Sequence, residues 1–577
     1  MLPQILRPVV KISYAIKTRH LQLPSVLAQN LNLSLQHHAH FTMYKPHVRD
    51  TKARNNSKPR RVNLSNKLRE EFAKHRGKTP VIQCKRMEFN FYEGMKYGKF
   101  DVVPLASKAW MHPGSNGDFF SLYENYMDPN DLHFGNSRLP KPPGLESFIV
   151  PPSVESDNET SAFSLLGIKD NLIQILKKEG VTQPADIQVE AIPPILEGKN
   201  CVVSAHTGCG KTLAYILPML QKVLDSNTKE GNIEVPHESP KAIILTPSRE
   251  LTYQIYEVLQ KLTAGLPLSC RAVVGGYAND GKEFPEVVDI VVASLGTFQK
   301  KLNKGALNLQ RVQYIVLDEA DQLADDQNRS IVRWILRQVQ IKQAPDEKDL
   351  FPGMDTVGSQ IVLASATMPT NLESLFGDLV DVQSLERVCT THLHNVLKSA
   401  PQLFLKVGKT NKGKALVDLV EKDVKHKRPV LIFSNTVKTA DWVSFQLNDC
   451  GFPCKNLTSN VPTAIRQHLF QRFQEGEFDI LSTTPMVARG LDTVRVKHII
   501  NFDFPLYVSE YIHQIGRVGR IGSSKSCHIT NIIAHPREVE LVRKIELSVR
   551  LNQKLDAVNA NIPGIIRHRR EKAEEQF

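Results

Sequence analysis

A phosphate-binding loop is the strongest chemical signal in the sequence. The residues Ala205-His206-Thr207-Gly208-Cys209-Gly210-Lys211-Thr212 lie between an apolar segment, 200–204, and a helical stretch, 213–224. Glycines let backbone N–H groups surround a phosphate at a helix N-terminus, whose dipole favours anions. Lys211 would neutralise the β- and γ-phosphates of ATP, and Thr212 would ligate Mg²⁺ through its hydroxyl. The usual pattern begins with Gly, where this chain has Ala205.

Two adjacent acids follow an apolar segment farther along the chain. Residues 314–318 are predicted to form a strand, and Asp318 and Glu319 stand at its end. Asp318 can hold Mg²⁺, and Glu319 can orient and deprotonate an attacking water. Acids also cap helices, because the first helical turn favours negative charge. The phosphate-binding loop upstream makes ATP hydrolysis the better interpretation.

Short apolar segments alternate with helical stretches and predict the fold that positions these residues. Nearly continuous apolar character is typical of parallel strands that helices cover on both faces. A first series of predicted strands comprises 200–204, 242–246, 289–293, 314–318 and 360–364. A second series comprises 429–433, 479–482 and 497–501. Two α/β units in tandem are therefore expected, joined near 386–400.

A set of further motifs resembles the DEAD-box RNA helicase family. Asp318-Glu319-Ala320-Asp321 spells the motif that names this family. The other segments that resemble its motifs are, in chain order, Phe163 with 180–188 (Q motif), 247–251 (Ia), Gly275-Gly276, 365–367 (III), 489–492 (V) and 513–520 (VI). An ordered set is far more specific than any one motif. The resemblance covers roughly 160–545 and implies an α/β fold of two tandem RecA-like domains with parallel sheets. Outside this range, the composition predicts a largely irregular N-terminal extension and a short basic C-terminal tail.

The resemblance implies roles around the nucleotide. Gln188 would hydrogen-bond the adenine edge, Phe163 would stack on the ring, and Asp492 would meet the ribose. Arg517 and Arg520, three residues apart, would reach the γ-phosphate as arginine fingers when the two units close.

The resemblance also implies coupling and RNA-contact residues. Ser365, Thr367 and His513 would couple closure to the catalytic acids. Contacts with RNA would be made to phosphates and 2′-hydroxyls without reading sequence. The expected RNA contacts are Arg249, Gly276, Gly296 and Thr484.

Four motifs depart from the family's pattern. Ser294-Leu295-Gly296-Thr297 stands where Thr-Pro-Gly-Arg is usual. Pro485 replaces the Asp of motif V, Gln514 replaces the second-position Arg of motif VI, and Val181 replaces the aromatic residue of the Q motif. These departures bear on RNA affinity and interdomain coupling, whereas the catalytic residues named above are all present.

Composition agrees with a polyanion-binding protein in a reducing compartment. The net charge of +13 favours contact with nucleic acid. None of the eight cysteines forms a CxxC pair, so they are predicted to be reduced thiols rather than zinc ligands. Without a run of about 18 apolar residues, no membrane span is expected.

The N-terminal residues have the composition of a targeting segment. Residues 1–49 carry six basic side chains and no acid, which is typical of a mitochondrial transit segment. A basic arm that binds RNA is the alternative. The predicted organisation is 1–49 transit segment, 50–155 N-terminal extension, 156–388 first RecA-like domain, 395–548 second RecA-like domain and 549–577 charged tail.

The predicted function is that of an ATP-dependent RNA helicase that unwinds or remodels structured RNA with ATP and Mg²⁺. An RNA-binding clamp with little ATP turnover is the alternative, and the Gln188 element argues against a DNA helicase. Segments 103–110, 535–539 and 542–547, with the basic leader, resemble the mitochondrial branch of animal DEAD-box helicases. That branch implies the mitochondrial matrix, with the nucleus or nucleolus as the alternative. Structured mitochondrial ribosomal RNA and large-subunit assembly intermediates would then be the partners.

Overall fold

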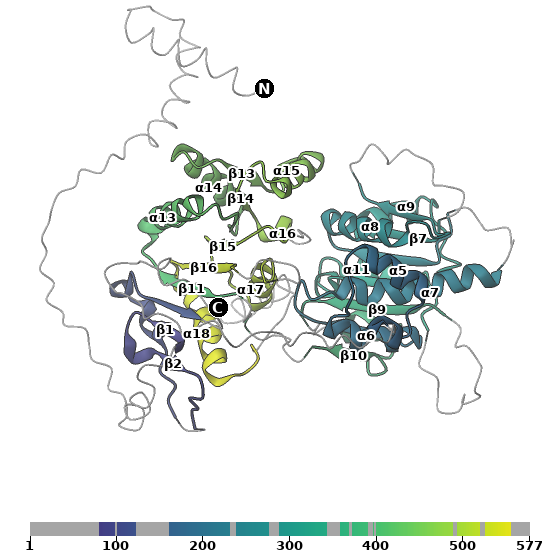
Figure 1. Cartoon of the computed structure of the whole chain (residues 1–577), viewed down its shortest axis with the longest axis horizontal. Helices are drawn as coiled ribbons and strands as arrows, with labels where there is room; N and C mark the ends of the chain where they lie inside the picture. Colours follow the sequence, from purple (N-terminus) through teal and green to yellow (C-terminus); the bar gives the residue numbers. More distant parts are fainter. Residues whose placement is uncertain are drawn as a thin grey trace, which may run out of the picture. The chain divides into compact units, whose positions relative to one another are not determined.

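The structure is a computed structural model, and it describes residues 80–98, 101–122, 161–230, 238–275, 288–342, 358–367, 372–390, 396, 400–488, 493–519 and 526–555. These residues form two α/β lobes, each built on its own sheet (Figure 1). We call residues 161–390 lobe 1, and residues 400–555 together with 80–122 lobe 2. None of the described helices is long and apolar enough to cross a membrane.

Lobe 1 contains a seven-stranded parallel sheet in the order β10-β4-β9-β8-β5-β7-β6. The strands are β4 (Cys201–Ser204), β5 (Ala242–Thr246), β6 (Cys270–Val273), β7 (Ile290–Ser294), β8 (Tyr314–Asp318), β9 (Gln360–Ser365) and β10 (Glu386–Cys389). Since β4, β9 and β8 are neighbours, the phosphate-binding loop, motif III and the DEAD motif that follow them meet at one edge of the sheet.

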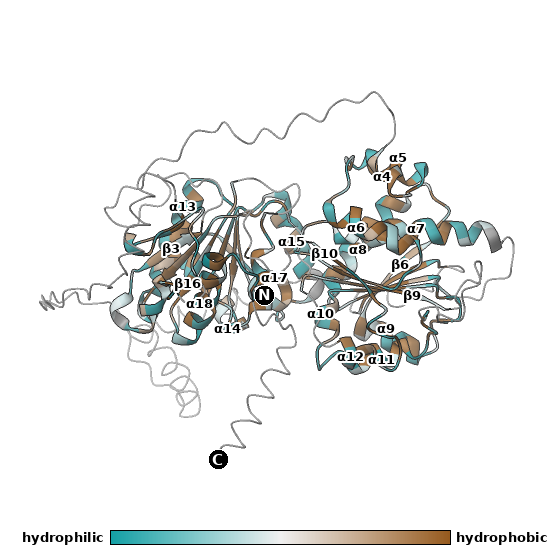
Figure 2. Cartoon of the chain, turned by 90° about the horizontal axis from the view of Figure 1, so that it is seen from below, coloured by the Kyte–Doolittle hydropathy of each residue, from teal (hydrophilic) through white to brown (hydrophobic). Residues whose placement is uncertain are grey.

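Helices cover both faces of this sheet. Successive residues of β4 point to opposite faces, so Val203 packs with α4–α8 and Val202 packs with α9–α12. Figure 2 shows α6, α7 and α8 on one side of the strands and α9, α11 and α12 on the other. The helices are α4 (Ala162–Leu165), α5 (Asp170–Lys178), α6 (Asp186–Leu196), α7 (Lys211–Glu230), α8 (Arg249–Thr263), α9 (Leu295–Asn303), α10 (Ala320–Leu323), α11 (Arg329–Leu336) and α12 (Leu372–Phe376).

The sequence predicted the central strands of lobe 1 better than its edges. The predictions at 242–246 and 314–318 coincide with β5 and β8. Those at 200–204, 289–293 and 360–364 differ from β4, β7 and β9 by one residue at one or both ends. Strands β6 and β10 were not predicted. They are the two edge strands, and charged side chains such as Arg271 and Arg387 interrupt their apolar pattern.

Lobe 2 repeats the architecture with six parallel strands in the order β13-β14-β12-β15-β16-β11. The strands are β11 (Gln402–Lys406), β12 (Val430–Phe433), β13 (Cys454–Leu457), β14 (Ile480–Thr483), β15 (His498–Asn501) and β16 (His528–Ile533). The helices are η6 (Lys409–Asn411), α13 (Lys412–Lys425), α14 (Val437–Asp449), α15 (Thr463–Glu475), α16 (Pro485–Ala488), α17 (Val508–Ile515) and α18 (Pro536–Leu551). Helices α13 and α14 pack on one face, and α17 and α18 pack on the other. The predicted strands 429–433, 479–482 and 497–501 overlap β12, β14 and β15.

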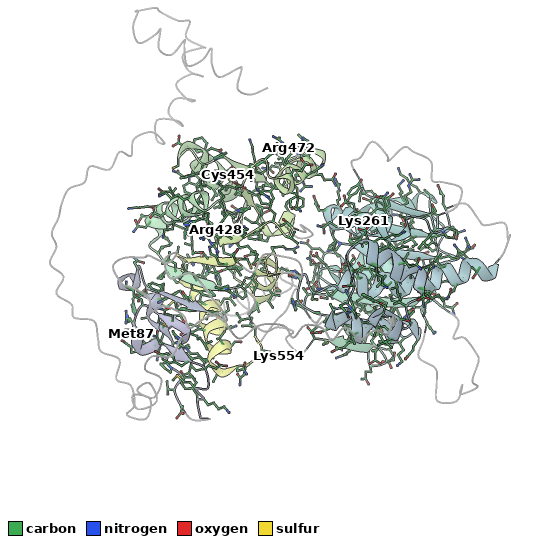
Figure 3. The ribbon with its side chains drawn as sticks, in the orientation of Figure 1. Met87, Lys261, Arg428, Cys454, Arg472 and Lys554 are labelled. Atoms are coloured by element: carbon green, nitrogen blue, oxygen red, sulfur yellow. The ribbon has the colours of Figure 1, made fainter. Side chains whose placement is uncertain are left out.

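Residues 80–122 add three strands to the lobe 2 sheet, although they precede lobe 1 in the sequence. The strand β3 (Phe119–Leu122) pairs antiparallel with β11, and β1 (Pro80–Cys84) and β2 (Phe91–Tyr92) follow it. The short helices η1 (Met87–Phe89), η2 (Ala106–Met111) and η3 (Pro113–Ser115) connect these strands. Met87, labelled in Figure 3, is 77% exposed on this segment. This region is more regular than the composition of 50–155 suggested.

A buried ion pair connects residues 80–122 to α18. Glu546 and Arg550 lie one helical turn apart, their charged atoms are 2.7 Å apart, and both side chains are fully buried. The Glu546 carboxylate accepts hydrogen bonds from the backbone N–H groups of Ala106 and Ser107, and Arg550 donates to the carbonyl of Phe89. Buried charges are tolerated only when they are paired and hydrogen-bonded. The N-terminal segment and the last helix therefore depend on each other.

Candidate active site

The phosphate-binding loop lies between the end of β4 and the start of α7. Lys211 is the first residue of α7, and its Nζ donates to the backbone carbonyls of Ala205 and His206 at 2.6 and 2.9 Å. Gly208 and Gly210 have φ angles of +80° and +95°, which favour glycine because it has no Cβ. The loop therefore wraps around the Lys211 ammonium, the group that a nucleotide phosphate would engage.

Gln188 supports the phosphate-binding loop from α6. Its Oε1 accepts from the N–H of Ala185 at 3.0 Å, and its Nε2 donates to the carbonyl of Gly210 at 3.1 Å. A Cβ at Gly210 would lie only 2.5 Å from Gln188 Nε2, so this approach requires glycine. Sequence reasoning assigned Gln188 to adenine and did not anticipate this support. Phe163, expected to stack on adenine, is 1% exposed and lies in the apolar core of lobe 1.

Asp318 ends β8, and its two carboxylate oxygens have different partners. Oδ1 accepts from the N–H of Glu319 at 2.8 Å, and Oδ2 accepts from the Tyr215 hydroxyl at 2.9 Å. Burial, and then the charge of Glu319, raise the pKa of Asp318 to about 6, although Lys211 and the two hydrogen bonds act in the opposite direction. Burial, and then the charge of Asp318, raise the pKa of Tyr215 well above its usual value. The Tyr215 hydroxyl thus remains a donor at neutral pH.

Tyr215 was missed by sequence reasoning, although a signal for it was present. It lies one helical turn after Lys211 on α7, so it shares a helix face with the catalytic lysine. A tyrosine hydroxyl in an otherwise apolar helical stretch indicates a buried hydrogen-bond partner.

Glu319 has an unusual backbone conformation. Its φ and ψ of 51° and 48° are left-handed, a conformation that costs a non-glycine residue about 1–3 kcal/mol and is enriched at functional sites. Gln322 Nε2 donates to Glu319 Oε2 at 2.7 Å, and Arg517 Nη2 lies 4.0 Å from Oε1. The strained turn orients the acid that the sequence predicts as the general base.

Asp321 brings motif III and motif VI together. The Thr367 hydroxyl donates to Asp321 Oδ2 at 2.6 Å, and His513 Nε2 lies 3.1 Å from the same oxygen. The hydroxyl of Ser365 in turn accepts from the N–H of Thr367 at 3.2 Å. The sequence predicted Ser365, Thr367 and His513 as coupling residues but did not name Asp321 as the partner they share.

Motif VI also contacts the phosphate-binding loop. The Thr207 hydroxyl donates to the carbonyl of Gly516 at 2.8 Å, and a Cβ at Gly516 would lie 1.5 Å from that hydroxyl oxygen. This contact explains why glycine stands immediately before Arg517. Three predicted site residues, Arg520, Asp492 and Gly276, lie outside the described residues, and their roles stay predictions.

The described candidate RNA contacts follow parallel strands. Arg249 begins α8 after β5, Gly296 lies in the first turn of α9 after β7, and Thr484 follows β14 in lobe 2. A Cβ on Gly275 would lie 3.2 Å from Thr297 Oγ1 and 3.5 Å from Arg249 Nη2. Arg249 and Thr297 therefore both approach Gly275, and the short Thr297 side chain stands where the family pattern has arginine.

Two family models match the chain across these motifs. The DEAD/DEAH box helicase family matches residues 185–375, and the helicase conserved C-terminal domain matches 411–522. The probable ATP-dependent RNA helicase DDX28 of Mus musculus is 30% identical over 84% of this chain and 86% of its own length. The Homo sapiens protein of the same name is 29% identical over the same shares. The chain belongs to the DEAD-box RNA helicase family.

Solved helicase structures share the fold. Saccharomyces cerevisiae Dbp5 bound to RNA and ADP BeF3 is 26% identical, with a TM-score of 0.57 over 68% of this chain and 94% of that chain. Mss116p bound to ssRNA and AMP-PNP has a TM-score of 0.58 over 69% of this chain and 79% of that chain, and at 24% identity it supports the fold alone. This helicase is therefore an RNA-binding ATP hydrolase built from two RecA-like domains.

Proposed function

We propose that this helicase remodels structured RNA by closing its two lobes around ATP and RNA, and that hydrolysis then releases the RNA. One observation carries the proposal: Asp321 Oδ2 is approached by Thr367 of lobe 1 and by His513 of lobe 2. A carboxylate that both lobes share can transmit closure to the catalytic acids beside it. Two ligands that both prefer the closed arrangement then favour each other's binding.

The ATP-site residues divide the chemistry among them. Lys211 would neutralise the β- and γ-phosphates, Glu319 would take the proton of the attacking water, and Arg517 with Arg520 would stabilise the charge that develops on the γ-phosphate. The approach of Arg517 to Glu319, 4.0 Å between Nη2 and Oε1, supports this assignment. A guanidinium that enters the site beside the general base lies where that charge develops.

Mg²⁺ fits the residues at this site. Thr212 and Asp318 supply a hydroxyl and a carboxylate oxygen, the hard ligands that Mg²⁺ prefers. Both interact with the same Tyr215 hydroxyl, which supports their lying close together. The ion would supply charge stabilisation at the phosphates, while Tyr215 would orient the Asp318 carboxylate.

The test is ATP hydrolysis by the purified full chain, with and without RNA, beside Glu319→Gln. Loss of the general base is expected to lower kcat by about 10²–10⁴-fold, with RNA binding retained. Glu257→Gln, at an exposed position of α8, is the matched control and should leave kcat unchanged. RNA-bound protein that turns over no faster than Glu319→Gln would instead establish the clamp.

We further propose that the helicase works in the mitochondrial matrix, on structured ribosomal RNA of the large subunit. The acid-free basic leader, residues 1–49, supports import. Fusion of residues 1–49 to a fluorescent reporter should send it to mitochondria, and replacing Arg7, Lys11, Lys17 and Arg19 with Gln should abolish this. Crosslinking of the Glu319→Gln protein to RNA in cells would then identify the substrate, and nuclear or nucleolar RNA alone would contradict the proposal.

A further inference from the structure

Two departures from the family pattern lie on one small, partly open cavity in lobe 2. Pro485 begins α16 and Gln514 lies in α17, and both line a cavity of about 10 Å³. The family pattern has an acid at the first position and an arginine at the second. Opposite charges at these two positions would face one cavity, whereas in this chain both positions are uncharged.

Gln514 is buried with its amide unsatisfied. Its residue is 2% exposed, and neither Oε1 nor Nε2 has a hydrogen-bond partner among the residues that the structure describes. His513 lines the same cavity, and its Nδ1 is likewise without a partner there. A cavity of this size accommodates about one water molecule, which needs two or more polar partners. The Gln514 amide and His513 Nδ1 are the polar groups without a partner on the residues that line it.

A water in this cavity would fix the tautomer of His513. His513 Nε2 faces the Asp321 carboxylate at 3.1 Å, so in the neutral ring Nε2 must carry the proton and Nδ1 must accept. Because the second ring nitrogen fixes the tautomer of the first, a donor at Nδ1 holds the ring in the state that bonds Asp321. A water oriented by Gln514 is such a donor.

We propose that Pro485 and Gln514 act as one uncharged unit in place of an ion pair, and that Gln514, through one water in their cavity, is a positioning residue for His513. The proposal rests on the proposed closure of the lobes for its effect on ATP turnover, but the cavity itself belongs to lobe 2 alone. Arg517 borders the same cavity, so a charge restored at either position would lie beside the proposed arginine finger.

The proposal predicts that substitutions at positions 485 and 514 are coupled. Glu510 and Arg517 line the cavity with one charge of each sign, so Pro485→Asp alone adds an excess carboxylate and Gln514→Arg alone adds an excess guanidinium. A buried charge without its partner is strongly destabilising, whereas a completed pair is tolerated. The double variant should therefore recover what each single variant loses.

A double-mutant cycle on the full chain tests the pairing. Each single variant should raise the unfolding equilibrium constant of lobe 2 by about 10-fold or more and lower the RNA-stimulated kcat by a similar factor, and the double variant should return to within about 3-fold of the parent. Effects that simply multiply in the double variant, or a Gln514→Arg variant that alone behaves as the parent, would overturn it. Coupling in unfolding without ATP turnover in any variant would contradict the proposed function and leave the pair standing.

Gln514→Leu tests the positioning role without introducing charge. It keeps the side chain's approximate volume but removes the amide, so kcat should fall by about 10-fold with KM for ATP nearly unchanged. Nitrogen NMR of ¹⁵N-histidine-labelled protein should show His513 leaving the Nε2–H tautomer in this variant. An unchanged His513 spectrum would overturn the positioning role, even if the variant is less stable.

Discussion

The two sheets differ in which parts of the chain supply their strands. Lobe 1 takes all seven strands from one continuous stretch, whereas lobe 2 takes six strands from the stretch after it and three more from residues 80–122. The lobe with the phosphate-binding loop is thus encoded locally. Lobe 2 is completed by a segment that the whole of lobe 1 separates from it in sequence. Burial at the junction of β3 with β11 is the reason for this arrangement.

That junction is apolar and well packed. The rings of Trp110 and Phe120 have centroids 5.5 Å apart, and those of Phe120 and Phe404 lie 4.7 Å apart, nearly parallel. All three residues are at most 1% exposed. Without β3, the β11 edge would expose unpaired N–H and C=O groups together with Phe404, a template for aggregation.

The largest expected effect follows from removing this segment. A chain of residues 161–577 should lose amide-exchange protection throughout β11 and α18, or aggregate, because the edge and the Glu546 partners are gone. Protection of β4, β8 and β9 in lobe 1 should persist. Hydrogen-exchange mass spectrometry measures both lobes in one sample.

A matched control keeps every described strand. Residues 80–577 retain β1–β3, so this chain should match the full-length protein in both lobes. Equal protection of β11 in the 161–577 chain would show that lobe 2 folds without the N-terminal strands. Residues 80–122 would then contribute nothing to the stability of lobe 2.

The next effect concerns the buried ion pair. Glu546→Ala leaves Arg550 buried without its carboxylate and the N–H groups of Ala106 and Ser107 without an acceptor, which should cost about 3–5 kcal/mol in the free energy of unfolding. Glu540→Ala on the same helix removes an exposed pair with Lys544 and should cost under about 1 kcal/mol. Urea unfolding of the two variants, followed by a lobe 2 probe, gives the comparison.

Replacing both partners refines this prediction. Glu546→Leu with Arg550→Met removes both charges, and replacing a whole pair by apolar groups is often neutral. The double variant should therefore be more stable than Glu546→Ala. A double variant as unstable as the single would show that the hydrogen bonds to residues 80–122, rather than the lone charge, dominate.

The sequence predicted the strands that pair within one continuous stretch better than the strand that pairs with a distant part of the chain. Strands β5 and β8 were predicted to the residue because they are apolar on both faces and lie between turn residues. β3 was not predicted, since Phe119–Leu122 is a short segment whose pairing with β11 depends on contacts far away in sequence. The ATP-site residues follow from local spacing, whereas Tyr215 and Asp321 gain their partners only when separate strands meet at one edge.

A smaller effect is expected at Asp318 in lobe 1. Its carboxyl has a pKa of about 6 in the folded protein against 3.8 ordinarily, so ionisation inside the fold costs about 3 kcal/mol above pH 6. Asp318→Asn removes that cost, keeps an acceptor for Tyr215 and loses the bond from Glu319 N–H, worth about 1 kcal/mol. Lobe 1 should gain about 2 kcal/mol without nucleotide at pH 8, while ATP hydrolysis is lost.

The pH dependence supplies the control for Asp318→Asn. A raised acid pKa means that the cost is absent below about pH 4, grows as pH rises from about 4 to 6, and is complete above that, so the gain in stability should shrink toward pH 4. Thermal unfolding of both proteins from pH 4 to 8 measures it. A gain that is independent of pH would point to packing rather than to the buried charge.

The smallest effect has the opposite sign and lies in lobe 2. Burial lowers the pKa of His528 well below 6.5, and the charges of His498 and Arg428 lower it further. The His528 ring stacks on that of His498 with centroids 3.9 Å apart, and His498 Nδ1 lies 2.6 Å from Asp423 Oδ2. Because the unfolded chain takes up a proton at His528 that the folded chain refuses, lobe 2 should lose stability as pH falls below about 6.5.

His528→Gln should therefore lower, by up to one, the number of protons that lobe 2 takes up when it unfolds in acid. His468→Gln, at an exposed position, should leave that number unchanged. Urea unfolding at pH 5 and pH 7.5 measures the difference. Lobe 1 loses stability toward high pH through Asp318 and lobe 2 toward low pH through His528, so acid should unfold lobe 2 before lobe 1. If acid instead removes amide protection from lobe 1 first, then Asp318 and His528 do not determine the pH dependence of the two lobes.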